Sequence, residues 1–285
     1  DEKCEIEPTK GTLDIRYEDE HFLVVNKPHS MPVHPVKQHQ SDTLANIVSY
    51  YCSQNGKPFV FRAINRLDKD TSGLVLIAKN RFTANAVKNK THKVYYALCE
   101  GEINIEGVVD KPMDLRDDSK MVRIVRDDGM KAVTHYKPLV ATKDFTLLEL
   151  WLETGRTHQI RCHMAYLGHP LMGDDLYGGK LDKISRQALH CARLEFYHPI
   201  KNEYITVTAE IPEKEIFRSK LMQEGIMETC RSKEPADQLI DHIDSYLKDK
   251  DNQYAIALEG DWGSGKTRFI EGKLNEYLEK GEYNL

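Results

Sequence analysis

The sequence predicts an α+β fold built around a largely antiparallel sheet with a few flanking helices. Between residues 108 and 211, five segments have the apolar patterns of strands, and one helical segment interrupts them. A run of strands with so few helices favours antiparallel pairing, because parallel strands need long crossover connections. The chain has 285 residues, 40% of them hydrophobic and 30% charged, which is enough to bury one or two cores.

The first elements are expected before residue 60. Residues 14–28 have the pattern of two short strands around an acidic turn. Residues 41–56 have the pattern of a helix with Ser41 or Asp42 as its N-cap and a glycine at its end. The apolar residues expected on one face of this helix are Leu44, Ile47, Val48 and Tyr51.

A buried strand and a short helix follow. The triplet Thr71-Ser72-Gly73 leads into an apolar run at 74–78, and residues 81–88 are predicted to be helical. A later helix is expected at 157–166. Its predicted core face consists of Ile160, Met164 and Leu167. The remaining strands are expected at 93–101, 121–125, 132–140, 145–154, 194–198 and 204–211.

The composition changes near residue 224, which predicts two domains, 1–224 and 225–285. The second has a polar connector, an amphipathic helix at 236–250 and a strand at 254–259. The sequence GDWGSGKT follows, a complete Walker A pattern for cradling phosphate. Its defining residues are Gly260, Gly265, Lys266 and Thr267.

This Walker A pattern is not expected to work in the chain as it stands. Only 18 residues, 268–285, follow it, and they contain no Walker B strand with a magnesium-binding aspartate. A P-loop domain needs roughly 100 residues or more. We therefore expect a truncated fusion or a gene-model join. ATP is a partner only if the segment is complete in the native protein.

Charge and cysteine content narrow the functional class. Residues 21–100 carry 11 Lys and Arg against 4 Asp and Glu, a surplus that suits either a polyanion such as RNA or a solvated surface. The six cysteines form no CxxC pair, which favours reduced thiols and a cytoplasmic protein. No apolar run is long enough for a membrane helix, and the acidic start is unlike a signal peptide.

Two segments carry candidate chemistry. Asp68 stands at the mouth of the buried strand, where a carboxylate needs a cation or donors to remain ionised. Arg66 and Lys69 are near in sequence, but a partner from a distant segment would be stronger. Basic side chains crowd the start of the helix at 157–166, beside a loop rich in glycine. They are Arg156, His158, Arg161 and His163. Their spacing, with His169, does not match a HExxH metal site.

Five blocks in this order resemble the RluA-type pseudouridine synthases over about residues 12–217. The blocks are FLVVNKPHSMPVHP, NRLDKDTSGLVLIAKN, KVYYALCEG, ETGRTHQIRCHMAYLGHPLMGDDLYGG and ALHCARLEFYHP. The resemblance implies the pseudouridine synthase fold, with helices around an RNA-binding cleft. The C-terminal segment, similarly, resembles the start of a KAP-type P-loop ATPase domain.

The resemblance also implies roles for single residues. Asp68 matches the essential aspartate, and Arg161 matches the arginine that pairs with it. Tyr95 matches the tyrosine that packs on the flipped base, and Arg66 matches the arginine that enters the RNA stack. Asn65 departs from the histidine common before RLD, and the connection from 80 to 93 is short. The short connection is expected to trim a helix beside the cleft and puts RNA specificity in doubt.

The reaction implied is the isomerisation of uridine to pseudouridine in rRNA or tRNA, without a metal, nucleotide or redox cofactor. Asp68 either attacks the sugar or removes a sugar proton. Two alternatives remain: an RNA-binding protein that has lost activity, and a synthase-like module fused to an ATPase.

Overall fold

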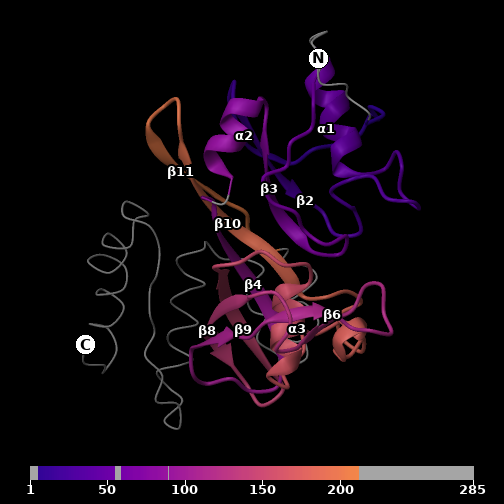
Figure 1. Cartoon of the computed structure of the whole chain (residues 1–285), viewed down its shortest axis with the longest axis vertical. Helices are drawn as coiled ribbons and strands as arrows, with labels where there is room; N and C mark the ends of the chain where they lie inside the picture. The colour runs from indigo at the N-terminus through magenta and orange to yellow at the C-terminus, as the bar shows by residue number, and fades with distance from the viewer. Residues whose placement is uncertain (1–5, 55–58, 89, 212–285) are drawn as a thin grey trace, which may run out of the picture. The chain divides into compact units, whose positions relative to one another are not determined.

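The computed structural model of the chain describes residues 6–54, 59–88 and 90–211 (Figure 1). The predicted domain boundary near residue 224 lies outside these residues. So do the helix at 236–250, the strand at 254–259 and the Walker A residues Gly260, Gly265, Lys266 and Thr267. The division into 1–224 and 225–285 therefore stays a prediction. In the described part of the chain, no helix is long and apolar enough to cross a membrane.

Nine strands form one sheet in the order β1-β2-β3-β10-β4-β9-β8-β5, and β11 pairs with β10 outside this path. These strands are β1 (Ile15–Glu18), β2 (Phe22–Lys27), β3 (Ser72–Ala78), β4 (His92–Glu100), β5 (Gly107–Asp110), β8 (Val133–Ala141), β9 (Phe145–Leu152), β10 (Leu189–His198) and β11 (Glu203–Thr208). All the described pairs in this sheet are antiparallel except β3 with β10. The predicted α+β class with a largely antiparallel sheet is confirmed.

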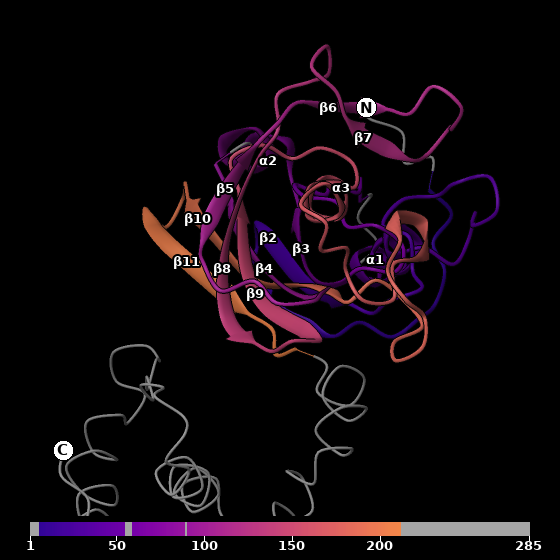
Figure 2. The same ribbon diagram turned by 90° about the horizontal axis from the view of Figure 1, so that it is seen from below.

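The helices and a small hairpin complete the described fold. They are α1 (Leu44–Ser53), α2 (Arg81–Val87), α3 (Gln159–Tyr166), a 3-10 turn η1 (Asp175–Tyr177), and the two-stranded sheet of β6 (Met113–Leu115) and β7 (Arg123–Val125). Figure 2 shows α1 and α3 on the inner side of the curved sheet. The sequence patterns did not predict β5, β6 or η1, which are short and only partly buried.

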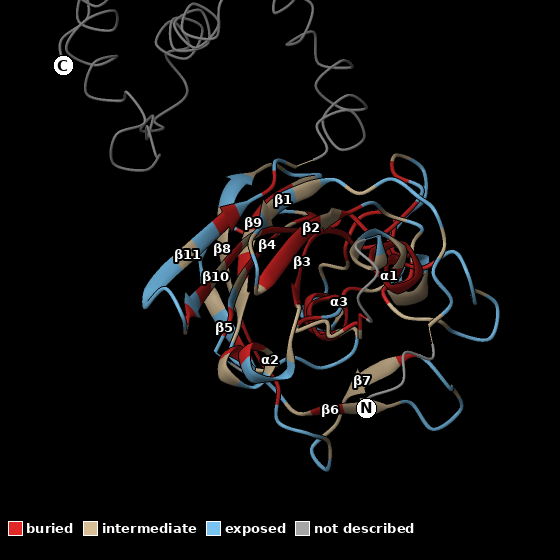
Figure 3. Cartoon of the chain, turned by 90° about the horizontal axis from the view of Figure 1, so that it is seen from above, coloured by how far each residue is buried: buried red, intermediate tan, exposed pale blue. Residues whose placement is uncertain are grey.

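The core follows the alternation of side chains along the strands. On β9, Leu148 and Leu150 belong to the main core, whereas Leu147 packs in a second cluster on the opposite face. Strand β3 is buried along its whole length (Figure 3). On one edge it pairs with β2, and on the other edge it pairs with β10 at Ser72 and Gly73 and with residues 62–65 further along. The continuous apolar run at 74–78 is the sequence counterpart of this burial.

The start of α1 differs from the prediction. Its N-cap is Thr43, not Ser41 or Asp42. The Thr43 hydroxyl accepts from the Asn46 amide at 3.4 Å, and Asn46 Oδ1 accepts from the Thr43 amide at 3.1 Å. The Asn46 side-chain amide also donates to two backbone carbonyls outside the helix, at 2.7 and 2.9 Å. These contacts with distant backbone select the capping residue, and the local sequence does not show them.

Two residues predicted for core faces are exposed instead. Tyr51 is 40% exposed, because its hydroxyl reaches out to donate to Glu18. Leu167 is 36% exposed, because the helix α3 ends before it and the chain turns away. The other predicted core residues of the two helices are buried.

Along one edge, strand β10 pairs first with β3 and then with β11. Its first part pairs with β3 at Ser72 and Gly73, and its second part pairs with β11 from Arg193 onward. At the β3 contact, Gly73 has a φ of 116°, and a Cβ there would lie 2.3 Å from the Cys191 carbonyl oxygen. Only glycine allows both this backbone conformation and this approach.

We expect Gly73→Ala to lower the free energy of unfolding by about 3 kcal/mol, because the methyl group meets backbone that cannot move aside. Urea denaturation of the purified protein would measure it. Gly155→Ala is the matched control, since a Cβ there meets nothing within 4 Å. Equal stability of the two variants would contradict this account of the β3–β10 contact.

Candidate active site

Asp68 lies in the turn that leads into β3. Its neighbour Leu67 is buried in the main core, and the Thr71 amide donates to the Asp68 carbonyl at 3.2 Å. The side chain of Asp68 keeps 26% of its surface exposed. The turn thus anchors its apolar residue inside and presents its carboxylate outward.

Two buried cations, Lys27 and Arg186, bind backbone carbonyls in and near this turn. Lys27 Nζ donates to the carbonyls of Pro28, Met31 and Lys69 at 2.8, 2.8 and 3.0 Å. Arg186 donates to the carbonyl of Asp70 at 3.2 Å. Burial lowers the pKa of Lys27 to about 7, against the opposing effect of the nearby carboxylates. The three carbonyl acceptors match the three protons of a charged ammonium, so we assign Lys27 the charged form.

Asn65, which departs from the histidine common at that position, serves as a structural residue. Its side chain donates to the Leu74 carbonyl at 3.0 Å and accepts from the Leu76 amide at 2.9 Å. The amide group thereby continues the ladder of β3 and fixes the start of the RLD segment against the strand. The helix of the short connection, α2, packs on β3 and β10. None of the described residues of α2 lines the cavity beside Asp68.

Arg161, on the first turn of α3, joins two carboxylates. Its Nε and Nη2 donate to the two oxygens of Asp174 at 2.6 and 2.7 Å. Its Nη1 donates to Oδ2 of Asp68 at 3.1 Å. The Asp174 side chain is fully buried and that of Arg161 is 7% exposed. Burial alone would lower the pKa of Arg161, but the bonds to Asp174 and then Asp68 raise it above its ordinary value. Arg161 therefore stays charged.

His158 and Tyr177 extend this cluster. His158 Nε2 is 3.7 Å from Oδ2 of Asp68, and His158 Nδ1 is 2.9 Å from the Tyr177 hydroxyl. The guanidinium of Arg161 lies 5.0 Å from the centre of the Tyr177 ring, within the range of a cation–π contact. The pKa of Tyr177 is raised to about 12, mainly by burial, so the phenol keeps its proton.

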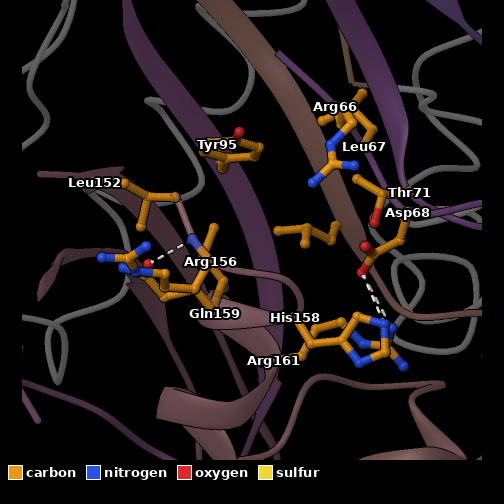
Figure 4. A pocket seen from close by; sticks show the side chains of 12 residues that line it. Arg66, Leu67, Asp68, Thr71, Tyr95, Leu152, Arg156, His158, Gln159 and Arg161 are labelled. Carbon is orange, nitrogen blue, oxygen red and sulfur yellow. Dashed lines mark hydrogen bonds and ion pairs between the residues drawn. The ribbon is translucent and has the colours of Figure 1, made fainter. Parts of the chain in front are cut away.

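Tyr95 lies on β4 across an open cavity of about 360 Å³ from Asp68 (Figure 4). Its side chain is almost fully buried, and its hydroxyl is hydrogen-bonded to the Cys191 thiol. Burial raises the pKa of Tyr95 well above its ordinary value, and Cys191 and Asp68 add to the effect. The cavity has an aromatic ring on one side and a carboxylate on the opposite side.

Arg66 and Arg156 stand at the rim of the cavity, and both side chains are exposed. Arg156 Nε donates to the Lys131 carbonyl at 3.2 Å. The structure thus brings together Arg66, Asp68, Tyr95 and Arg161, the four residues singled out for the synthase site.

The remaining histidines of this region have structural partners. His163 contacts the Thr134 hydroxyl at 2.8 Å and the Lys111 carbonyl at 3.0 Å. His169 contacts the Glu100 carbonyl at 2.8 Å. Across the described residues, no group of three or more His, Cys, Asp and Glu is placed to hold a metal ion.

Sequence reasoning did not single out Lys27, Asp174, Tyr177 or Arg186 as residues of the site. The block that ends in GDDLYGG carries both Asp174 and Tyr177, and its glycines mark a tight turn. The signal available in the sequence is an aspartate in a glycine-rich turn that follows an arginine-bearing helix. Nothing in the local sequence distinguishes Asp174 from its exposed neighbour Asp175.

Comparisons with known proteins identify the family of the chain. Residues 21–166 match the family model described as RNA pseudouridylate synthase. The uncharacterized RNA pseudouridine synthase YjbO of Bacillus subtilis is 45% identical over 207 residues, which cover 70% of this chain and 73% of that protein. The ribosomal large subunit pseudouridine synthase D of Zymomonas mobilis is 38% identical over 227 residues, covering 73% of this chain and 72% of that protein.

A solved structure has the same fold. Human RNA pseudouridylate synthase domain containing 4 aligns with a TM-score of 0.58 and 26% identity, over 73% of this chain and 92% of that one. The chain belongs to the RNA pseudouridylate synthase family. It is an isomerase that forms pseudouridine in RNA. Separately, residues 233–282 match the model described as KAP family P-loop domain.

The shared guanidinium generates a stability prediction. Arg161→Ala leaves the buried Asp174 carboxylate without its two donors, so the free energy of unfolding should fall by about 3–5 kcal/mol. Arg161→Lys keeps the charge but loses the paired hydrogen bonds to Asp174. Its free energy of unfolding should therefore lie between those of Arg161→Ala and the wild type. Urea denaturation measures both.

Arg156→Ala serves as the control, because Arg156 is exposed and pairs with no carboxylate among the described residues. Its effect should stay within about 0.5 kcal/mol. A similar small effect for Arg161→Ala would show that Asp174 does not depend on the guanidinium.

Proposed function

We propose that the enzyme isomerises uridine in rRNA or tRNA without a cofactor, with Asp68 as the catalytic aspartate. The observation that carries this proposal is the position of its carboxylate. It lies partly exposed in the cavity, 3.1 Å from a buried guanidinium and across from the Tyr95 ring. The fork of Arg161 on Asp174 fixes this guanidinium, and its remaining nitrogen orients the Asp68 carboxylate.

The reaction breaks the N1–C1′ bond, turns the base and joins C5 to C1′, with release of the C5 proton. Asp68 acts in one of two ways. It attacks C1′ as a nucleophile, or it removes a sugar proton to give a glycal. Both routes need an ionised oxygen facing the sugar, which the partly exposed carboxylate supplies.

Tyr95 and Arg66 are proposed to handle the flipped nucleotide. A base must leave its stack before an enzyme can act on it, and stacking on an aromatic ring offsets part of that cost. The Tyr95 ring lines the cavity opposite Asp68. Arg66, exposed at the rim, is placed to fill the space that the uridine leaves.

The RNA substrate is proposed from the relatives. The Zymomonas mobilis protein is named for the ribosomal large subunit. Ribosomal RNA is therefore the first substrate to test, with transfer RNA as the second. We also infer that the enzyme works in the cytoplasm, where these RNAs are found.

Two alternatives have distinct signatures. An RNA-binding protein without activity would bind RNA and leave its uridines unchanged; Asp68 beside Arg161 and Tyr95 argues against it. A synthase-like module serving an ATPase would hydrolyse ATP, and Lys266→Ala would abolish that hydrolysis.

Asp68→Asn should abolish pseudouridine formation, because the amide is neither a nucleophile nor a base at this position. The variant should fold normally and still bind RNA, since the amide has nearly the same shape. Release of tritium from C5-labelled uridine in RNA measures turnover, and a filter-binding assay measures affinity. Normal turnover by Asp68→Asn would end the proposal.

Arg66→Ala should slow turnover more for a uridine flanked by duplex than for one in unstructured RNA, by roughly tenfold or more. The physical reason is that an intact stack closes again unless a side chain occupies the gap. Paired synthetic RNAs with the same target sequence test this. Equal losses on both RNAs would count against the wedge role.

A further inference from the structure

The imidazole of His158 lies beside the same carboxylate oxygen that Arg161 contacts (Figure 4). Its Nε2 is 3.7 Å from Oδ2 of Asp68, and Nη1 of Arg161 is 3.1 Å from that oxygen. The His158 side chain is 8% exposed and lines the cavity. Two nitrogens therefore converge on Oδ2, whereas Oδ1 accepts no hydrogen bond from any of the described residues.

The other ring nitrogen fixes the tautomer of His158. The Arg123 amide donates to the Tyr177 hydroxyl oxygen at 2.9 Å, and Nδ1 of His158 lies 2.9 Å from the same hydroxyl. Because the amide can only donate, the phenol proton is free to point at Nδ1. Nδ1 is then the acceptor, and the proton of the neutral ring sits on Nε2, facing Asp68.

The backbone does not explain why a histidine occupies this position. His158 has a φ of 58°, in the left-handed region, and its side chain makes no cap bond to α3. Glycine adopts this conformation at lower cost, and asparagine is found in it as readily as histidine. Histidine differs from both in its reach, since only its ring spans from the Tyr177 hydroxyl to the Asp68 carboxylate.

The charged groups around His158 come from four elements. Asp68 approaches from the turn before β3, Arg161 from α3, Asp174 from the loop before η1 and Arg123 from β7. Burial is the main cause that lowers the pKa of His158 below its ordinary value. Asp68 and Asp174 oppose the shift, whereas Arg161 and Arg123 add to it. The ring is therefore neutral at pH 7.

We propose that His158 is a positioning residue, which holds Oδ2 of Asp68 together with Arg161 and leaves Oδ1 to face the uridine. In this arrangement Tyr177 sets the tautomer that makes His158 a donor. The inference rests on the proposed catalytic role of Asp68. The distance of 3.7 Å is longer than a hydrogen bond, and such contacts tighten when substrate fills a site.

Two substitutions separate the reach of the side chain from its local structural role. His158→Gln retains an amide donor near the place of Nε2, whereas His158→Asn suits the left-handed backbone but cannot reach Asp68. The substrate is RNA from cells that lack the gene, labelled with tritium at C5 of uridine. We expect His158→Asn to lower kcat by roughly 100-fold, with KM for this RNA changed less than about threefold. His158→Gln should recover at least a tenth of the wild-type kcat.

The tautomer is tested by the pH dependence of kcat. Tyr177→Phe removes the donor to Nδ1, so Nδ1 takes a proton from water more readily and the pKa of His158 rises. An imidazolium binds Oδ2 more tightly and makes the carboxylate less reactive. The acidic limb of kcat should therefore move to higher pH in Tyr177→Phe. It should not move when Tyr177→Phe is added to His158→Gln, which has no ring to titrate.

Thermal unfolding of each variant shows that it is folded, and His92→Asn is the control histidine, 47% exposed and outside the cavity. Equal kcat for His158→Asn and His158→Gln would overturn the proposal, as would a loss carried by KM alone or an unmoved acidic limb in Tyr177→Phe. Failure of the catalytic role of Asp68 would look different, because Asp68→Asn would then retain turnover whatever the His158 variants do.

Discussion

The guanidinium of Arg161 joins three segments of this enzyme that are separate in the sequence. Arg161, on α3, forks onto the buried Asp174 of the loop before η1 and reaches Asp68 in the turn before β3. Two of its nitrogens donate to the carboxylate of Asp174, which is fully buried. The third nitrogen therefore has a fixed direction, and this direction sets where the Asp68 carboxylate lies. A lysine could not replace Arg161, because a single ammonium cannot bind one carboxylate with two parallel hydrogen bonds and also position a second carboxylate.

The same turn is held from its other side by Lys27 and Arg186. Both are buried cations that bind backbone carbonyls, not the Asp68 carboxylate. Their hydrogen bonds thus position the turn and leave the oxygens of Asp68 to other partners. Hydrogen bonds from Lys27 and Arg186 to backbone carbonyls fix the turn on its buried side. The contact of Asp68 with Arg161 fixes it on the cavity side. This arrangement keeps Asp68 in place while its own surface remains open to a nucleotide.

Most of the fold could be predicted from apolar runs, because long strands such as β4 and β9 carry apolar residues on both of their faces. Short elements such as β5 and β6 carry too few residues for a period to show. The N-cap of α1 was missed because contacts of Asn46 with distant backbone choose it. At the site, Asp68 and Arg161 belong to blocks with a family resemblance, and the structure brings them together. Asp174, Tyr177 and Lys27 were missed because their importance arises from burial and partners up to tens of residues away, which no local pattern records.

The parallel contact between β3 and β10 bears on how the enzyme is made. Strand β3 ends at Ala78, but its neighbour on one side begins at Leu189. Residues 62–65 pair with most of that edge, through backbone hydrogen bonds to Leu76 and Ala78, whereas the pairing of Ser72 and Gly73 with β10 forms only after more than a third of the chain has followed. The turn with Asp68 directly precedes Ser72, and its partner Arg161 lies 93 residues further along the chain. The Asp68 carboxylate is therefore synthesised early and positioned late.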